Sequence, residues 1–263
     1  MTATRFARVL AWALASCFLA AAALAQQPSG PGTYEPTPGQ PGKDVVWLPT
    51  PQALVDKMLD MGQVTAKDYV IDLGSGDGRL VITAAKRGAR AMGIEYNPDM
   101  VTLSQAAAQK EGLANRAEFM KADLFESDLS RATVITMFLL PEINLKLRPK
   151  LLELRPGTRI VSNSFNMGDW SPDDSATLDS STGCDGAWCT ALLWIIPARV
   201  AGTHKLPQGE LTLEQKYQMV TGTLRADGGV VPVQGVVRGN DVVLTAGGRQ
   251  LRGAMNGDRL ELR

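Results

Sequence analysis

The sequence predicts an α/β fold, in which a parallel β-sheet carries helices on both faces and a small antiparallel β-module follows it. Short apolar segments alternate with segments of helical period between residues 45 and 162, and this alternation is typical of a parallel sheet. A hairpin signal, Asp185-Gly186, interrupts the alternation. From about Arg199 onward, short alternating segments are separated by glycine-containing turns, and no helical pattern remains.

Five strands are expected in the parallel part of the sheet, and each is a short apolar run next to a turn residue. They fall at residues 69–71, 91–95, 117–120, 133–140 and 158–162. The interruption that follows predicts two adjacent strands within residues 175–197. The second of these, 190–196, is apolar throughout and is expected to be central and buried.

The helices are marked by their start and stop signals. Thr50-Pro51 predicts a helix start, with a capping hydroxyl followed by proline at the first helical position. Helical patterns at 79–87 and 98–110 end near glycines. Residues 142–153 are also helical in pattern, and Pro149 is expected to break this helix into two pieces.

Residues 1–25 have the pattern of a secretory signal peptide, which predicts cleavage between Ala25 and Gln26. Two arginines precede an apolar stretch at 9–22, and small residues follow it. The stretch is short for a membrane anchor, which is one alternative, and a lipid-modified Cys17 is another. We therefore expect the mature chain to be periplasmic or secreted, without a membrane span.

Three segments are expected in the mature chain. Residues 26–44 carry five prolines and four glycines, which predicts a flexible or extended linker. The main domain covers 45–198, and the small β-module covers 199–263. Within the module, residues 235–244 resemble residues 253–262 at a spacing of 18, as repeated hairpins would.

Composition excludes several functions. The 27 basic and 27 acidic residues cancel, so no electrostatic footprint suggests a nucleic-acid partner. The single histidine, His204, lies outside the main domain, which argues against a Ser-His-Asp triad and a metal site. Cys184 and Cys189 flank the hairpin tip and can form a disulfide if the loop is long, whereas a two-residue turn would strain the bond.

The main functional signal is the segment 72–78, DLGSGDG, between a predicted strand and a predicted helix. Glycines at such a turn let the backbone approach a ligand closely. The third glycine comes earlier than in the G-x-G-x-x-G motif of dinucleotide sites. Asp72 would repel a pyrophosphate but suits a cofactor with ammonium and sulfonium charges, so the segment favours S-adenosylmethionine.

Two further acids follow the next two strands. Glu95 lies 19 residues beyond Gly76, where a carboxylate can accept hydrogen bonds from both ribose hydroxyls. Asp123 follows the third strand, where a carboxylate can accept from an adenine amino group. Because the carboxyl ends of parallel strands meet at one sheet edge, the three acids are expected in one pocket.

Together with Leu48-Pro49-Thr50-Pro51 and the segment 165–170, these motifs resemble those of class I methyltransferases, which have a Rossmann-like seven-stranded sheet ending in an antiparallel hairpin. The likeness covers about residues 46–198 and is similar in more detail to the protein-lysine methyltransferases of the ATP-synthase c-subunit and adenine nucleotide translocase type. The resemblance implies a cofactor site made by Thr50, Asp72, Gly74, Ser75, Gly76, Asp77, Glu95, Tyr96, Asp123 and Leu124.

The acceptor side of the site is expected at the end of the fourth strand. Phe138 is expected to wall an acceptor channel and Glu142 to orient an amine; alternatively, Phe138 is a core residue and Glu142 only a favourable acid in a helix's first turn. Phe165 and Trp170 are expected either to form a lip or to pack. The hypothesis is methylation of a protein lysine, although the sequence does not name the acceptor, which is a protein or a small molecule. The alternative is an exported binding protein without catalysis.

Overall fold

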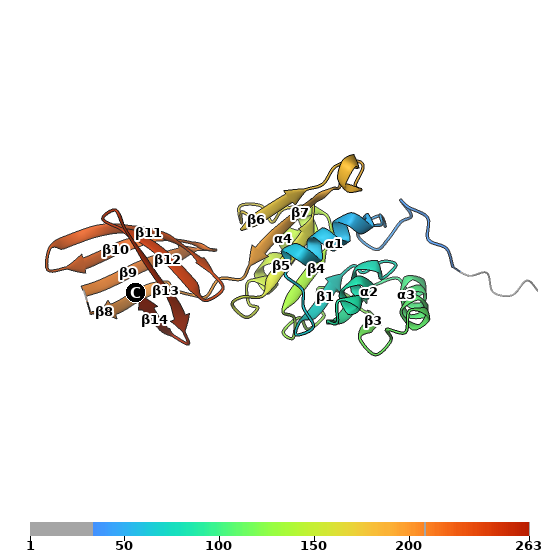
Figure 1. Ribbon diagram of the computed structural model, residues 1–263, viewed down its shortest axis with the longest axis horizontal. Coiled ribbons are helices and arrows are strands. Elements are labelled where there is room, and N and C mark those ends of the chain that lie inside the picture. Colours follow the sequence, from blue (N-terminus) through green and yellow to red (C-terminus); the bar gives the residue numbers. More distant parts are fainter. Residues whose placement is uncertain (1–33, 208, 263) are drawn as a thin grey trace, which may run out of the picture. The chain divides into compact units, whose positions relative to one another are not determined.

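The computed structural model describes residues 34–207 and 209–262, in which two seven-stranded sheets follow one another along the chain (Figure 1). The predicted signal peptide and its cleavage site fall outside these residues. Within the described part of the chain, no helix has the length and apolar character needed to cross a membrane.

The first sheet has the strand order β3-β2-β1-β4-β5-β7-β6. The first five strands run parallel, and β7 is antiparallel to both β5 and β6. This confirms the predicted parallel sheet with an antiparallel hairpin. The strands are β1 (Tyr69–Leu73), β2 (Arg90–Glu95), β3 (Ala117–Lys121), β4 (Val134–Met137), β5 (Arg159–Asn163), β6 (Asp174–Thr177) and β7 (Thr190–Ile195).

The order reverses at β1, which pairs with β2 on one side and β4 on the other. In open α/β sheets, such a reversal leaves a crevice at the carboxyl ends of the strands, because the loops from the two neighbouring strands diverge there. The segment 72–78 begins at the carboxyl end of β1 and therefore opens into this crevice. The topology thus puts the glycine loop where a ligand site is expected.

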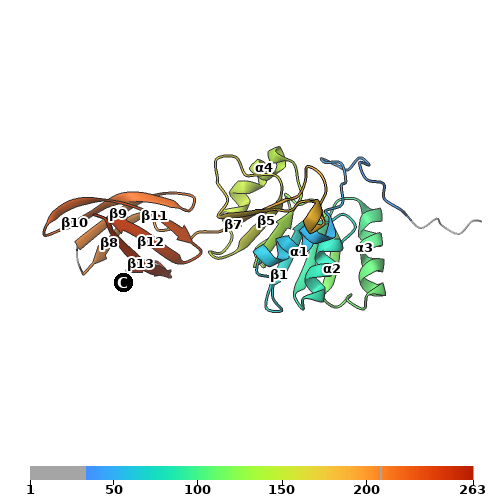
Figure 2. The same ribbon diagram turned by 45° about the horizontal axis from the view of Figure 1, so that its top comes forward.

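Helices cover both faces of the first sheet (Figure 2). One apolar cluster contains Val70 and residues from α1, α2 and α3, whereas the other contains Ile71 and residues from α4. Adjacent strand residues point to opposite faces, so β1 is buried on both sides. The helices are α1 (Gln52–Met61), α2 (Arg79–Lys86), α3 (Pro98–Lys110) and α4 (Pro141–Leu151).

The predicted cap of the first helix is wrong. Pro51, not Thr50, is the N-cap residue of α1, and it makes no side-chain capping bond. The hydroxyl of Thr50 instead accepts a hydrogen bond from the Asn163 side chain at 3.4 Å. A long-range contact at the carboxyl end of β5 has therefore replaced the local cap that the sequence suggests.

The predicted break at Pro149 is also wrong, since α4 continues through it to Leu151. Proline removes the backbone donor to the carbonyl oxygen four residues earlier, but α4 ends only two residues later, so no second helical piece of any length lies beyond it. The next residue, Lys150, donates to the carbonyl oxygen of Phe125 at 2.7 Å, and Leu147 and Leu151 are fully buried. These contacts hold the last turn in place.

The second sheet is antiparallel, and its strands lie in sequence order from β8 to β14. Four of its hairpin turns, from β10 to β14, fall at the predicted glycine-containing positions, whereas the β9–β10 turn at Tyr217-Gln218 contains no glycine and was not predicted. The predicted 18-residue repeat corresponds to two hairpins, β11–β12 and β13–β14. The strands are β8 (Gly202–Leu206), β9 (Gly209–Lys216), β10 (Met219–Ala226), β11 (Gly229–Arg238), β12 (Asp241–Ala246), β13 (Arg249–Asn256) and β14 (Arg259–Leu262).

The connection between β6 and β7 is longer than a tight hairpin turn. It contains a short 3-10 helix, η1 (Ser180–Thr182), and a disulfide between Cys184 and Cys189, whose Cα atoms are 5.8 Å apart. The two-residue turn at Asp185-Gly186 is therefore not the whole connection. The connection runs from residue 178 to residue 189, longer than a loop of residues 185–188, and it allows the bond, as the alternative with the longer loop expects.

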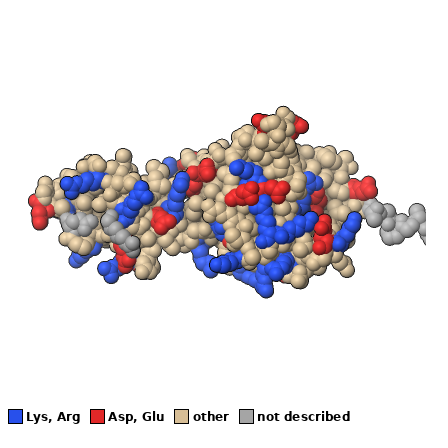
Figure 3. Space-filling model, viewed as in Figure 1, with Lys and Arg blue, Asp and Glu red and all other residues tan. Residues whose placement is uncertain are grey.

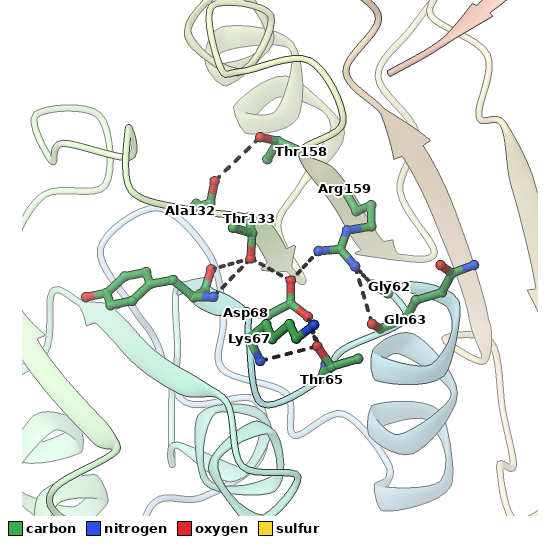
Figure 4. A network of polar contacts seen from close by, with 10 residues as sticks. Gly62, Gln63, Thr65, Lys67, Asp68, Ala132, Thr133, Thr158 and Arg159 are labelled. Atoms are coloured by element: carbon green, nitrogen blue, oxygen red, sulfur yellow. Dashed lines mark hydrogen bonds and ion pairs between the residues drawn. The ribbon is translucent and has the colours of Figure 1, made fainter. Parts of the chain in front are cut away.

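At the amino-terminal edge of the sheet, opposite the crevice, Asp68 ties three strands together (Figure 4). Its carboxylate accepts hydrogen bonds from the hydroxyls of Thr133 (2.8 Å) and Thr65 (2.9 Å) and pairs with Arg159. Burial by itself would raise the pKa of Asp68, but these hydrogen bonds outweigh it and hold the pKa below its usual range. The network is structural, because it lies away from the glycine loop.

Replacement of Asp68 with asparagine should destabilise the protein by about 3 kcal/mol at pH 7, since it leaves the Arg159 guanidinium without its charge partner. A lowered pKa gives stability that is present above the unfolded-state pKa and is lost on acidification, so the difference should shrink below about pH 4. Urea unfolding at the two pH values measures this. The control is Asp60→Asn, because the side chain of Asp60 is 64% exposed in its ion pair with Arg87. This variant should lose less than about 1 kcal/mol of unfolding free energy. An equal loss of stability in the two variants would contradict the account.

Candidate active site

The glycine loop joins β1 to α2 through backbone conformations that favour glycine. Gly76 has a φ of +54° and Gly78, the N-cap residue of α2, has a φ of +79°. A Cβ atom at Gly76 would lie 2.5 Å from Nε1 of Trp47, and one at Gly78 would lie 2.7 Å from the ring of Phe119. Both positions therefore need glycine for its conformation and for close packing.

A cleft opens beside this loop, and its residues come from the carboxyl ends of the strands and from the segment 40–50. It encloses about 1090 Å³, its open mouth included. Every residue of the predicted cofactor site lines it: Thr50, Asp72, Gly74, Ser75, Gly76, Asp77, Glu95, Tyr96, Asp123 and Leu124. The structure thus brings the three strand-end acids into one cleft, as the sequence predicts.

Asp72 is the buried acid of this cleft. Its carboxylate accepts a hydrogen bond at 2.7 Å from the hydroxyl of Thr136, which is its register partner on β4. Burial raises the pKa of Asp72 to about 7, and the nearby carboxylates of Glu95 and Asp77 add to the increase, while the bond from Thr136 opposes it. A cationic ligand would favour the ionised form and so offset the cost of burying the charge.

Glu95 ends β2 and fixes the shape of the loop. One carboxylate oxygen accepts from the backbone N–H of Gly76 at 2.9 Å, and the other accepts from the N–H of Asn97 at 2.9 Å. Each oxygen keeps a second lone pair for a ligand. Glu95 is therefore held in place by the backbone and can still accept hydrogen bonds from a ribose.

Asp123, beyond the end of β3, is bound by a residue from the predicted linker. Lys43 Nζ lies 2.6 Å from its carboxylate and 4.5 Å from the ring centroid of Tyr96. This hydrogen bond, together with one from the backbone N–H of Phe125, lowers the pKa of Asp123. The lysine thus contacts two of the predicted cofactor residues.

Part of the predicted linker is therefore folded. The N–H of Trp47 donates to the carbonyl of Gln40, and the N–H of Gly42 donates to that of Val45, both at 2.9 Å. These bonds close a tight turn that lines the cleft. The prediction of a flexible or extended linker is wrong for residues 40–44, because the turn and the Lys43 ion pair hold them against the main domain.

Two observations test whether these residues fit S-adenosylmethionine. The hydroxyl of Ser75 has no hydrogen-bond partner among residues 34–207 and 209–262, but it is buried against Gly93 and is not exposed to the cleft, so it is not assigned to a ligand. Asp77 is held at 2.5 Å by Arg79, which also donates to the carbonyl of Thr50 at 2.9 Å. Carboxylate acceptors around a glycine loop suit a cationic nucleoside, and the basic side chains of the cleft, Lys43 and Arg79, are already paired with acids.

The residues predicted for the acceptor side have different surroundings in the structure, and only some of them line a cavity. Phe138, beyond the end of β4, is half-buried and lines both the cofactor cleft and a second cavity beside it. Glu142 lies exposed in the first turn of α4 and does not line either cavity, so its role as an orienting acid stays a prediction. Trp170 is fully buried, as the packing alternative expects, whereas Phe165 lines the second cavity.

Sequence reasoning missed three residues of the site: Lys43, Trp47 and Thr136. Thr136 could have been found from the sequence, because it is the one residue with a hydroxyl in the apolar strand Val-Ile-Thr-Met. In the structure it lies opposite Asp72 on the neighbouring strand. No sequence pattern marks Lys43 or Trp47, since their partners Asp123 and Gly76 are distant in the chain.

Comparisons with known proteins agree with this geometry. The ANTKMT methyltransferase domain matches residues 72–174. A protein-lysine N-methyltransferase of Saccharolobus islandicus is 45% identical over 49% of this chain and 83% of its own length. The lysine N-methyltransferase of the human ATP-synthase c-subunit is 37% identical over 45% of this chain, and the chain spans only about half of that relative's length (50%).

A solved structure is similar as well. An RNA methyltransferase from Salinibacter ruber, in complex with S-adenosyl-L-homocysteine, is 46% identical and covers 58% of this chain and 96% of its own, with a TM-score of 0.54. That protein holds the product form of the cofactor proposed from the glycine loop. The names of these similar proteins differ in the methyl acceptor, a protein lysine in some and RNA in the other.

Proposed function

Because this chain belongs to the S-adenosylmethionine-dependent methyltransferase family that includes the protein-lysine N-methyltransferase of Saccharolobus islandicus, we propose that it methylates the side-chain amine of a protein lysine. The observation that carries the proposal is the cleft in which the carboxylates of Asp72, Glu95 and Asp123 surround the glycine loop. The choice of lysine as the acceptor rests on two observations: the relatives are lysine N-methyltransferases, and an apolar cavity lies beside the cleft.

Each residue of the cleft has a distinct task in this proposal. S-Adenosylmethionine, when bound, supplies a methyl carbon that its sulfonium activates toward an amine. Asp72 binds the ammonium group, Glu95 accepts from the ribose hydroxyls, and Asp123 accepts from the adenine amino group. Since Lys43 contacts Asp123 at 2.6 Å, adenine binding requires that this lysine shares or releases the carboxylate.

On the acceptor side, the residues have to hold a neutral amine. A lysine amine has an ordinary pKa of about 10.4 and must lose its proton before it can attack. The second cavity has apolar walls that include Phe138, Leu139 and Val46, and such walls disfavour the charged ammonium. Phe138 therefore acts as a wall that excludes water and orients the amine.

We favour a protein acceptor over RNA. The chain carries 27 basic and 27 acidic residues. Figure 3 shows both signs mixed over most of one face, with Lys and Arg gathered along its lower edge. RNA-binding surfaces collect positive charge, because the phosphate backbone supplies most of the affinity. The alternative of a binding protein without catalysis has no observation in its favour.

We further propose that the protein works outside the cytosol, in the periplasm or after secretion. The signal-peptide pattern of residues 1–25 is the basis of this proposal. The disulfide between Cys184 and Cys189 supports it, because structural disulfides persist in oxidising compartments. A fusion of residues 1–30 to a reporter that is active only after export tests it, and a reporter that stays inactive would count against it.

Methyl transfer from radiolabelled S-adenosylmethionine tests the main proposal. The purified protein should label a lysine-containing protein mixture and should fail to label the same mixture after its amines have been acetylated. Mass spectrometry should then place the methyl group on lysine. Labelling that survives acetylation, or labelling of RNA alone, would contradict the lysine acceptor while leaving the cofactor assignment intact.

A further inference from the structure

The cavity beside the cofactor cleft points to how the acceptor is recognised, and the inference rests on the function proposed above. Nine of the residues that line this cavity also line the cofactor cleft, among them Phe138 and Leu139. The other three are Leu140, Phe165 and Trp188. A molecule held in this cavity would therefore border the cofactor cleft directly.

Three aromatic rings form one wall of the cavity. The ring centroids of Phe165 and Trp188 are 5.0 Å apart, and Phe138 lies 6.0 Å from Phe165 and 6.3 Å from Trp188. Rings at these separations are in contact, so they leave no space between them for a ligand. They offer a continuous apolar surface along which a flexible chain can lie.

Two of the rings stand on fixed backbone at the ends of sheet strands. Phe138 follows β4 directly. Phe165 follows Ser164, whose φ of +60° is a left-handed conformation that is uncommon for serine. The carbonyl oxygen of Phe165 accepts hydrogen bonds from Ser162 at 2.8 Å and from Asn144 at 3.1 Å. This part of the wall is therefore built into the sheet.

The third ring depends on the disulfide. Trp188 directly precedes Cys189, and both Cys184 and Cys189 are buried in an apolar cluster that also contains Leu54 and Val55 of α1. The bond anchors the two ends of the loop in the core, while Trp188 stays 42% exposed at the cavity. A large ring held at the surface in this way is typical of a recognition residue, because aromatic anchors dominate binding energy.

We propose that Trp188, presented by the disulfide-closed loop 184–189, determines acceptor specificity by packing against the aliphatic stem of an amine such as a lysine side chain. The unbranched stem lies along the three rings. Asp44 and Lys43 line the same cavity, and the Lys43 ammonium lies 4.0 Å from the Asp44 carboxylate. The loop thus makes acceptor binding, but not cofactor binding, depend on the disulfide.

Calorimetry with two ligands tests this inference. The first is S-adenosylhomocysteine, and the second is its analogue in which nitrogen replaces sulfur and carries an aminobutyl chain that mimics the lysine stem. In Trp188→Ala, affinity for the analogue should fall about tenfold, the loss expected when about two methylene groups are no longer buried, while affinity for S-adenosylhomocysteine stays unchanged. Trp188→Phe, which keeps an aromatic ring, should bind the analogue with most of the wild-type affinity.

The double variant Cys184→Ala/Cys189→Ala should lose affinity for the analogue to a similar extent, and a melting curve shows whether it is folded. Asp185→Asn, an exposed change in the same loop, is the matched control and should bind both ligands as the wild type does. Equal binding of the analogue by the wild type and Trp188→Ala would overturn the inference. If S-adenosylhomocysteine itself fails to bind the wild type, the proposed function is wrong, and the inference falls with it.

Discussion

Replacement of Asp72 with asparagine should weaken binding of S-adenosylmethionine by about 100-fold or more and should also stabilise the cofactor-free protein above pH 7. The loss of affinity follows because a buried carboxylate that pairs with a ligand cation contributes about 2–5 kcal/mol. The gain in stability follows because the folded protein ionises this carboxyl at a cost. Calorimetry and urea unfolding of the same variant measure the two effects.

The effect of Asp72→Asn on the stability of the cofactor-free protein depends on pH, and its sign follows from the pKa of Asp72. Burial raises the pKa of Asp72 from 3.8 to about 7, so the folded state binds more protons than the unfolded state between these values. The stability that this proton gives is complete below about pH 4 and is lost as the pH rises through 7. The complete loss of this stability corresponds to about 4 kcal/mol of unfolding free energy. This value is the upper limit for how much Asp72→Asn can stabilise the cofactor-free protein at pH 8.

Binding of the cofactor should show the opposite dependence in the wild type. Since the cation needs the ionised carboxylate, affinity should fall as the pH drops below about 7, by up to tenfold per unit, and the asparagine variant should lack this change. Asp227→Asn, in an exposed turn between β10 and β11, serves as the matched control. An asparagine variant that binds S-adenosylmethionine like the wild type would contradict the role of Asp72.

Replacement of Glu95 with glutamine should lower affinity for S-adenosylhomocysteine by about 10- to 100-fold. Hydrogen bonds to a charged acceptor contribute about 1.5–3 kcal/mol, and the amide group of glutamine keeps only one acceptor oxygen. The same carboxylate also holds the N–H groups of Gly76 and Asn97, so part of the loss comes from the loop. Calorimetry measures the total.

A ligand without the 2′-hydroxyl separates the two contributions. The wild type should bind 2′-deoxy-S-adenosylhomocysteine more weakly than the parent ligand, whereas Glu95→Gln should bind the two ligands almost equally. Glu118→Gln, an exposed change on β3, should behave as the wild type. If the glutamine variant still distinguishes the two ligands as strongly as the wild type does, Glu95 does not bind the ribose.

Much of the cofactor cleft could be predicted from the sequence, because its residues lie at fixed positions relative to strands that local patterns reveal. Asp72, Glu95 and Asp123 each come at or beyond the end of an apolar run, and the parallel topology then requires them to share an edge. The four hairpin turns between β10 and β14 were predictable for the same reason, since glycine-containing pairs mark them locally, whereas the β9–β10 turn at Tyr217-Gln218 has no such mark.

Contacts between distant segments could not be predicted. The ion pair of Lys43 with Asp123 spans 80 residues, and nothing in the proline-rich segment around Lys43 marks its partner. Thr50 has the local pattern of a helix cap, but a bond from Asn163, which is 113 residues away, takes its hydroxyl. In both cases, a tertiary contact has outweighed a local preference.

The disulfide shows a third kind of limit. Cys184 and Cys189 were compatible with bonding or with separation, because the outcome depends on the length of the loop rather than on the cysteines themselves. The structure has a short helix before the loop and starts β7 only at Thr190, which brings the two Cα atoms within 5.8 Å. This geometry also places Trp188 at the second cavity, which no sequence pattern indicated.

Calorimetric titration of the purified protein with S-adenosylmethionine and, in parallel, with NADH tests the central claim most directly. A cleft of three carboxylates around a glycine loop should bind S-adenosylmethionine at a single site, with a Kd on the order of micromolar, and should not bind the pyrophosphate of NADH. Tighter binding of NADH, or no heat from S-adenosylmethionine at about millimolar concentration, would contradict the account.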